Sequence, residues 1–446
     1  MNTPICDFVE KYAKSEALRL HMPGHKGVGG MGVEGLDITE IEGADVLYSA
    51  TGIIAESEEN ASSLFGSERT LYSTEGSSLS IRAMLYLALL WGQSEGRGRT
   101  VIAGRNAHRV FHSAAALLDL DVEWLTGEGG GLMACPITPE ELDRVLAATG
   151  ERAFAVYLTS PDYLGNELDI KGLSDVAERY GVLCLVDNAH GAYLRFLSES
   201  RHPMDNGAHM CADSAHKTLP ALTGAGYLHI SPSAPRMLSD EAESAMALFA
   251  STSPSYLILQ SLDRVNGYLA DGYGERLCGF SEKVSLLKAR LAAMGYHLLG
   301  SEPLKLTVDA KSYGYFGTEI AEHLLLSSIV CEHSDRDAVV LMLTPDLSDT
   351  ELERIFEAFS SLEKRAEKKE KAPSVEMRGA VMSIREATFS RRERIPVKNA
   401  LGRVLADMAV SCPPAIPIAV CGERIDENAI ELFEYYGIDE VAVVVE

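Results

Sequence analysis

Strand-length apolar runs alternate with helix-like segments between residues 100 and 187. Alternation at this spacing predicts βαβ units, and therefore a mostly parallel sheet with helices on both faces. The last run, Val182 to Asp187, is apolar up to its final residue, as strands of buried parallel sheets are. We expect one large α/β domain, with strands at 100–103, 122–125, 153–158 and 182–187 and helices at 107–118, 138–148 and 172–180.

Asp187 stands at the carboxyl end of the last of these strands, where open α/β sheets bind their ligands. An aspartate in that place can hold a pyridinium nitrogen protonated, which pyridoxal phosphate needs to act as an electron sink. Ala189 lies on the same side as Asp187 and is small enough for a flat ring to rest against it. The ordinary alternative is an aspartate that caps the next turn.

Lys217 lies at the edge of a second apolar stretch, Cys211 to Ile230, which Leu219-Pro220 interrupts. An ammonium in apolar company is rare unless it is paired or used. A desolvated lysine loses its proton more readily and can form an imine with an aldehyde. Ser214 and His216 are close enough in sequence to donate to an anion beside it. A loop lysine beside a serine turn is the alternative, and the strand-end Asp-x-Ala upstream favours the cofactor site.

Gly76-Ser77-Ser78 leads into an apolar helix over Ile81 to Trp91. A glycine that allows close approach, two hydroxyls and the open amides of a helix start form an anion site suited to a cofactor phosphate. A serine N-cap with nothing bound is the alternative. The pairing of this segment with Lys217 favours the phosphate.

The strings VDNAHG and ADSAHKTLPALTGAGYLHI resemble the Orn/Lys/Arg decarboxylase family of fold-type I pyridoxal-phosphate enzymes, in the short form without an amino-terminal wing domain. The likeness extends over nearly the whole chain, in order: LHMPGHKG at 20–27, STEGSSLSIRAM at 73–84, GRNAHRVF at 104–111, TSPDYLGN at 159–166, STSPSYLILQSLD at 251–263 and LGRVLADMAVSCPPAIP at 401–417.

The resemblance implies an aspartate-aminotransferase-like large domain with a mostly parallel sheet, a smaller α/β domain and a C-terminal α+β domain. We expect an amino-terminal arm at 1–45, a cofactor-binding domain at 46–275, the small domain at 276–372 and the C-terminal domain at 373–446. The patterns beyond residue 275 predict helices at 282–294, 317–327 and 349–371 and strands at 304–308, 329–331 and 339–343.

The resemblance also implies roles for particular residues. Lys217 would hold pyridoxal 5′-phosphate, Asp187 would keep its ring nitrogen protonated, and His108 would stack on the ring opposite Ala189. Gly76, Ser77, Ser78, Ser214 and His216 would cradle the phosphate, to which a neighbouring subunit would lend Ser251 and Thr252, so that a homodimer or larger homo-oligomer shares its active sites. Lys217 and His190 are the candidates for returning a proton to Cα. By position alone, Ser160 and Tyr163 follow a strand and could line either the ring oxygen of the cofactor or the substrate. Glu332 and Asp335 are the candidate contacts to a basic side chain of the substrate.

The implied reaction is the α-decarboxylation of arginine, lysine or ornithine to the amine and CO2, by a cytoplasmic lyase of polyamine biosynthesis. Transamination or β-elimination on the same cofactor is an alternative. A non-catalytic regulatory homologue is another, although such a protein would be expected to have lost Lys217 or Asp187. Departures from the family pattern concern the substrate: Asn188 replaces the Glu of DEAHG, and Val46 and Tyr48 stand where Asn and His are expected.

Composition excludes several other classes. With 46% hydrophobic and 24% charged residues and a formal charge of −25, the chain is a globular protein that should not bind nucleic acid or anionic membranes. The amino terminus lacks the apolar core of a signal peptide, and the apolar run from Ala83 to Trp91 is too short to span a bilayer. Eight cysteines without a C-x-x-C pair indicate reduced thiols of a cytosolic protein, and we expect no metal site.

Overall fold

The computed structural model describes residues 1–127, 129, 131–376, 378–408, 411–412 and 416–445. The chain forms two compact units. The first unit comprises Met1–Gly98, Gly150–Leu158 and Ile170–Arg276, and the second comprises Arg99–Thr149, Thr159–Asp169 and Leu277–Glu446.

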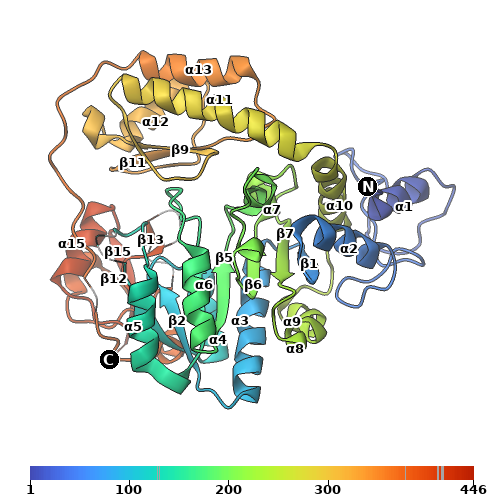
Figure 1. Ribbon diagram of the computed structural model, residues 1–446, viewed down its shortest axis with the longest axis horizontal. Helices are drawn as coiled ribbons and strands as arrows, with labels where there is room; N and C mark the ends of the chain where they lie inside the picture. The colour runs from blue at the N-terminus through green and yellow to red at the C-terminus, as the bar shows by residue number, and fades with distance from the viewer. Residues whose placement is uncertain (128, 130, 377, 409–410, 413–415, 446) are drawn as a thin grey trace. The chain divides into compact units, whose positions relative to one another are not determined.

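A seven-stranded sheet has the order β1-β7-β6-β5-β4-β2-β3. Its strands are β1 (Arg69–Ser73), β2 (Thr100–Gly104), β3 (Asp121–Leu125), β4 (Ala153–Thr159), β5 (Leu183–Asp187), β6 (Met210–Asp213) and β7 (Gly226–Ile230). β5 runs parallel to β6 and β2 runs parallel to β3, whereas β7 is antiparallel to both β6 and β1. Figure 1 shows β5, β6 and β7 side by side. The predicted α/β class with a mostly parallel sheet is confirmed.

Helices cover the strands of the first unit because their apolar positions match the buried sheet. α3 (Ser77–Ser94) packs against β5, β6 and β7, and α6 (Ile170–Arg179) packs against β5. Gly92 of α3 allows the helix to approach the sheet, since a Cβ there would lie 2.5 Å from the Cβ of Phe154 on β4.

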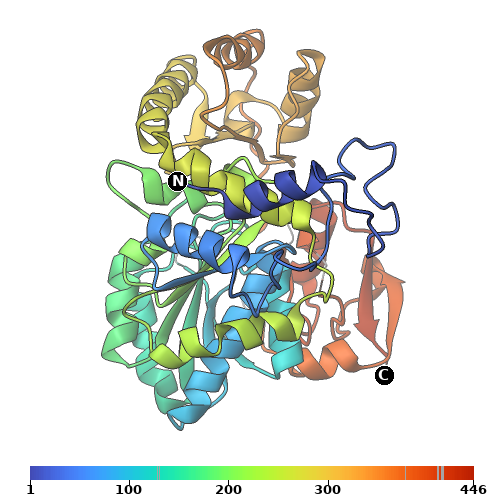
Figure 2. The ribbon, with the colours of Figure 1, turned by 90° about the vertical axis from the view of Figure 1, so that its right-hand side faces the viewer.

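A second group of helices in the first unit is joined by a buried carboxylate. α1 (Pro4–Ala13) and α2 (Ile53–Phe65) pack against each other and against α10 (Tyr256–Ala270), and Figure 2 shows α1 beside α10. Asp263 of α10 accepts hydrogen bonds from the backbone N–H of Cys6 at 2.9 Å and from the hydroxyl of Ser57 at 2.6 Å. The sequence pattern predicts one amphipathic helix over residues 3–19, but α1 ends at Ala13. This unit also contains α7 (Ala215–Thr218), α8 (Arg236–Asp240) and α9 (Ala242–Phe249).

The second unit contains a four-stranded antiparallel sheet in the order β10-β11-β9-β8. Its strands are β8 (His297–Leu299), β9 (Lys305–Asp309), β10 (His333–Ser334) and β11 (Ala338–Met342). Figure 1 shows three helices on one side of this sheet: α11 (Tyr273–Ala293), α12 (Gly317–Leu326) and α13 (Asp349–Ser360). The helices α4 (Arg109–Leu118) and α5 (Pro139–Thr149) also belong to this unit.

Two predictions for this unit are wrong. The helix expected to reach residue 371 ends at Ser360, because Leu352, Ile355 and Phe359 are the last apolar side chains that it can bury on one face. The charged residues that follow are mostly exposed. The strand expected at 329–331 is absent among the described residues, since Val330 is 83% exposed, and the chain pairs only at β10, where His333 is opposite Val340.

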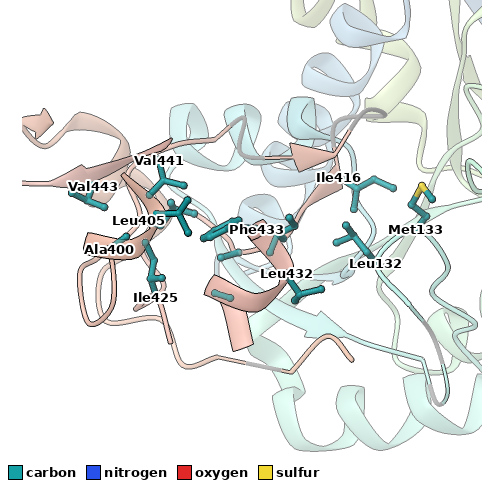
Figure 3. Close-up of a cluster of buried hydrophobic side chains, with 14 residues drawn as sticks. Leu132, Met133, Ala400, Leu405, Ile416, Ile425, Leu432, Phe433, Val441 and Val443 are labelled. Carbon is teal, nitrogen blue, oxygen red and sulfur yellow. The ribbon is translucent and has the colours of Figure 1, made fainter. Parts of the chain in front are cut away.

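The C-terminal part of the second unit has its own apolar core, drawn in Figure 3. It contains α14 (Ile384–Phe389), β12 (Arg392–Pro396), β13 (Ser411–Cys412), β14 (Ile416–Pro417), α15 (Glu427–Tyr435) and β15 (Glu440–Val444). Leu432 and Phe433 of α15 pack with Leu132 and Ile416 in that core. Residues 413–415 of the proline-rich PPAIP loop lie outside the described residues.

Two absences concern the described residues alone. No helix there is both long and apolar enough to cross a membrane. Cys6, Cys135, Cys184, Cys211, Cys278, Cys331 and Cys421 are free thiols.

The C-terminal core gives a prediction about stability. Phe433 is fully buried, so Phe433→Ala removes apolar contacts and leaves a cavity, and should lower the free energy of unfolding by about 3–5 kcal/mol in urea denaturation. Phe389 is 63% exposed, so the same substitution there should have little effect. Equal losses in the two variants would show that Phe433 is not part of a packed core.

Candidate active site

The parallel pairing of β5 with β6 brings the two central candidate residues to one edge of the sheet. Asp187 is the last residue of β5 and is in register with Ala212 on β6. β6 ends one residue later, at Asp213, and Lys217 follows in the one-turn helix α7. The lysine expected at a strand edge therefore lies just beyond it, on a helical turn.

Asp187 is 3% exposed, and its carboxylate accepts two hydrogen bonds. Oδ2 accepts the hydroxyl of Tyr157 on β4 at 3.0 Å, and Oδ1 accepts the backbone N–H of Ala189 at 3.2 Å. Burial raises the pKa of Asp187, while the positive charge of Lys217 and these two hydrogen bonds oppose the rise. Asp187 and Lys217 are thus close enough to interact electrostatically.

Lys217 is half-buried, and its Nζ lies 3.1 Å from Nε2 of His190. An ammonium can only donate, so a charged Lys217 donates this hydrogen bond to a neutral His190, whereas a deprotonated Lys217 can accept a hydrogen bond from His190. The two candidate proton donors are therefore hydrogen-bonded to each other.

The segment from Gly76 to Ser78 forms the start of α3, with Gly76 as its N-cap at φ +67°. No side chain of the N-cap occupies the first amides of the helix. Ser214 donates its hydroxyl to that of Ser77 at 2.8 Å, and a Cβ on Gly76 would lie 3.6 Å from Cε1 of His216. The Ser77 and Ser214 hydroxyls, the first amides of α3 and the ring of His216 thus lie near Gly76, and all of these groups can donate to an anion.

The approach of the backbone at this cradle depends on Gly226 as well. A Cβ there would lie 2.8 Å from the carbonyl carbon of Gly76 and 2.9 Å from the nitrogen of Ser77, closer than real Cβ contacts. The Nδ1–H of His216 donates to the carbonyl of Ala225 at 2.8 Å, which leaves Nε2 for a ligand. One unit thus contains groups that can bind an anion, a buried acid and a nearby amine. These fit the phosphate, the ring nitrogen and the aldehyde of pyridoxal phosphate, respectively.

Ser251 and Thr252 are both exposed, before α10. The backbone N–H of Ser251 donates to the carboxylate of Glu75 at 2.6 Å, which places this segment beside the residue that precedes Gly76.

The other candidate residues belong to the second unit. His108 is the N-cap of α4, and its Nδ1 accepts the N–H of Val110 at 3.3 Å. His112, one turn on, is fully buried, and burial lowers its pKa to about 3, so it stays neutral. Ser160 is buried, and its Oγ accepts the N–H of Leu168 at 3.0 Å.

Tyr163 and Glu332 meet within the second unit, although they are far apart in sequence. The hydroxyl of Tyr163 donates to Oε1 of the exposed Glu332 at 3.1 Å, and its ring meets that of His333 edge-on at 5.3 Å. Asp335 instead accepts the N–H groups of Asp337 at 2.7 Å and Ala338 at 2.8 Å. Its buried carboxylate thus shapes the turn between β10 and β11, next to Glu332.

Two residues near the carboxyl ends of β5 and β6 were not predicted from the sequence. The first is Tyr157, whose only signal was a hydroxyl in an otherwise apolar strand. The second is Asp213, which accepts Nε2–H of His202 at 3.0 Å and the amide of Asn188 at 2.7 Å, and lies 3.3 Å from Nε2 of His229. His202, Cys211 and Asp213 have donor atoms compact enough for a metal ion, but hydrogen bonds already account for His202 and Asp213.

Asn188 thereby acquires a structural explanation. Its amide points to Asp213, so a glutamate in this place would set one buried carboxylate against another. Its side chain also requires Gly191, where a Cβ would lie 2.1 Å from Oδ1 of Asn188. The departure from DEAHG at residue 188 therefore matches the acid at residue 213.

The sequence of this chain matches two models of one protein family. The family model "Orn/Lys/Arg decarboxylase, major domain" matches residues 3–285, and "Orn/Lys/Arg decarboxylase, C-terminal domain" matches residues 360–441. Arginine decarboxylase of Bacillus subtilis (strain 168) is 29% identical, over 96% of this chain and 92% of that protein. Constitutive lysine decarboxylase of Escherichia coli (strain K12) is 26% identical over 54% of this chain and 34% of that protein.

Solved structures show the same fold. The Francisella novicida lysine decarboxylase superposes with a TM-score of 0.80 at 15% identity, covering 99% of this chain and 81% of that chain. The major-domain match alone spans more than half of the chain. The chain therefore belongs to the Orn/Lys/Arg decarboxylase family, whose members are pyridoxal-phosphate-dependent lyases that decarboxylate basic amino acids.

Proposed function

We propose that this chain removes the α-carboxylate of arginine, lysine or ornithine as CO2, and that Lys217 and Asp187 are the centre of its active site. The observation that carries the proposal is the edge of β5 and β6, where a buried acid and a half-buried amine interact beside the glycine and serine cradle of α3.

In this proposal, each candidate site residue of the first unit has its own role. Lys217 holds the cofactor covalently, and Asp187 accepts a hydrogen bond from the protonated ring nitrogen. Ser77, Ser78, Ser214 and His216 bind the phosphate, which Gly76 allows to approach the backbone, and Ala189 forms one wall for the ring. When bound, pyridoxal phosphate supplies an electron sink for the electron pair that the departing carboxylate leaves at Cα. Together, these residues must hold the Cα–carboxylate bond of the substrate perpendicular to the ring.

The contact between His190 and Lys217 suggests how the proton returns to Cα. The 3.1 Å hydrogen bond lets a proton pass between the two nitrogens, so that Lys217, once released by the substrate's amine, delivers it while His190 supplies it. His190 is buried, which keeps this proton from exchanging freely with water.

The second unit supplies the remaining candidates. In our proposal His108 forms the other wall for the ring, and Tyr163 and Glu332 bind the cationic end of the substrate. Glu332 is exposed and carries a charge opposite to that of a guanidinium or ammonium, and Tyr163 orients its carboxylate. Asp335 supports the turn that presents Glu332, and Ser160 secures the loop that carries Tyr163.

We also propose that the protein works as a homodimer or larger homo-oligomer with shared active sites, to which Ser251 and Thr252 contribute, in the cytoplasm and in polyamine biosynthesis. The amino-terminal arm supports a subunit interface, because it exposes apolar side chains that a monomer would leave in water. Leu18, Leu20, Val28 and Met31 are each about four-fifths exposed, at 82%, 81%, 79% and 84%.

The role of Lys217 can be tested directly. Lys217→Ala should abolish both CO2 release and the visible absorption of the bound cofactor, because no amine remains to hold it. Lys171, an exposed lysine of α6, provides the control, and Lys171→Ala should keep both properties. An unchanged absorption spectrum in Lys217→Ala would exclude Lys217 as the attachment point.

The substrate can be identified by measuring CO2 release from arginine, lysine and ornithine separately. At least one should react, and Glu332→Gln should raise its KM about 10-fold or more, as expected when a hydrogen bond between charged groups is lost. Glu322→Gln removes the same charge from α12, outside the hairpin, and should leave KM unchanged. No reaction with any of the three amino acids would contradict the proposed function.

The proposed interface predicts the state of the protein in solution. Light scattering should give at least twice the mass of one chain, and Leu20→Asp with Met31→Asp should weaken association and reduce activity. Leu286 is 63% exposed on α11, so Leu286→Asp should leave the mass unchanged. A monomer that decarboxylates at the full rate would rule out shared active sites.

A further inference from the structure

Tyr157 donates a side-chain hydrogen bond to the carboxylate of Asp187, and it was not among the site residues predicted from the sequence. It lies on β4, next to β5 in the sheet order, and is completely buried, as are Phe154, Ala155 and Leu158 of the same strand. The phenol oxygen lies 3.0 Å from Oδ2 of Asp187. A buried tyrosine hydroxyl needs a polar partner, and this one reaches the end of the neighbouring strand.

The direction of this hydrogen bond follows from the chemistry of the two groups. An ionised carboxylate can only accept, so the phenol donates. Burial, followed by the nearby charge of Asp187, raises the pKa of Tyr157 well above its ordinary value, so the hydroxyl keeps its proton. Tyr157 is therefore always the donor in this hydrogen bond and Asp187 the acceptor, and the hydrogen bond favours the charged form of the acid.

The carboxylate has room for a further donor. Its two oxygens offer about four lone-pair directions, of which the hydroxyl of Tyr157 and the N–H of Ala189 use one each. One donor is on β4 and the other lies in the turn after β5, so together they restrict rotation of the carboxylate about its Cβ–Cγ bond. A planar acid held in this way presents its remaining lone pairs in a fixed direction.

We propose that Tyr157 is a positioning residue of the decarboxylase: its hydroxyl keeps Asp187 ionised and oriented to receive the protonated ring nitrogen of the cofactor. The inference rests on the role of Asp187 in the proposed function. Without the hydroxyl, the buried acid takes up a proton more readily in the cofactor-free protein, and binding of the pyridinium must first displace that proton. In this proposal Tyr157 acts on the cofactor through Asp187.

The test measures cofactor affinity rather than turnover. The full-length chain is freed of cofactor and titrated with pyridoxal phosphate and with 1-deazapyridoxal phosphate, which has a carbon in place of the ring nitrogen. Tyr157→Phe should weaken the binding of pyridoxal phosphate about 10- to 100-fold, the change expected for loss of a hydrogen bond to a charged group. Its affinity for the deaza analogue should equal that of the unmodified chain, because the analogue has no nitrogen for Asp187 to hold.

Tyr227→Phe is the matched control. Tyr227 on β7 is also fully buried in the first unit, and its hydroxyl has no hydrogen-bond partner among the described residues. Removing that hydroxyl should change neither affinity. Circular dichroism of the cofactor-free variants verifies that each has folded before it is titrated.

Three results separate the possible failures. Equal weakening of both ligands by Tyr157→Phe would mean a general packing role and would overturn the inference, as would no weakening of either. Asp187→Asn tests the proposed function itself and should weaken pyridoxal phosphate more than the deaza analogue. If Asp187→Asn leaves both affinities unchanged, the role of Asp187 fails; if only Tyr157→Phe leaves them unchanged, the positioning role alone fails.

Discussion

The candidate site depends on the parallel pairing of β5 with β6. Two parallel strands end at the same edge of a sheet, so a residue that closes one strand meets the segment that leaves the other. Asp187 and the turn that carries Lys217 meet for this reason, although about thirty residues separate them in sequence. β7 and Gly226 then bring the backbone against the start of α3, and the cradle for an anion forms beside the acid and the amine.

This edge also contains two buried carboxylates on neighbouring strands, and they differ in the donors that surround them. Asp187 receives the hydroxyl of Tyr157 and the charge of Lys217, whereas Asp213 receives the amide of Asn188 and a proton donor on His202. Burial opposes the ionisation of both acids, yet the contacts of Asp213 lower its pKa overall, while the pKa of Asp187 remains raised. The acid that can gain most from a further positive partner is therefore Asp187.

In the second unit, the hairpin that carries Glu332 is connected to the C-terminal helix α15. Tyr435 of α15 donates its hydroxyl to Asp337 at 2.6 Å, and Lys311 forms an ion pair with the same carboxylate at 2.6 Å. Arg336, between Asp335 and Asp337, lies over the ring of Tyr435 and pairs with Glu370. The C-terminal core in Figure 3 thus supports, through α15, the turn next to the proposed substrate contact.

Local patterns were sufficient for the class of fold and for the residues with chemistry of their own. Apolar runs at βαβ spacing predicted the parallel sheet, and Asp187, Lys217 and the glycine and serines of α3 stood out because a strand-end acid, an amine in apolar company and a glycine before a helix are unusual within their own neighbourhoods. Tyr157 and Asp213 did not stand out, since each acts through a neighbouring strand, and strand order is decided by packing of the whole sheet. For the same reason, only the tertiary structure showed that Tyr163 contacts Glu332 and that Asp335 supports the turn of a hairpin. It also showed that α13 ends where the helix has no further apolar side chains to bury.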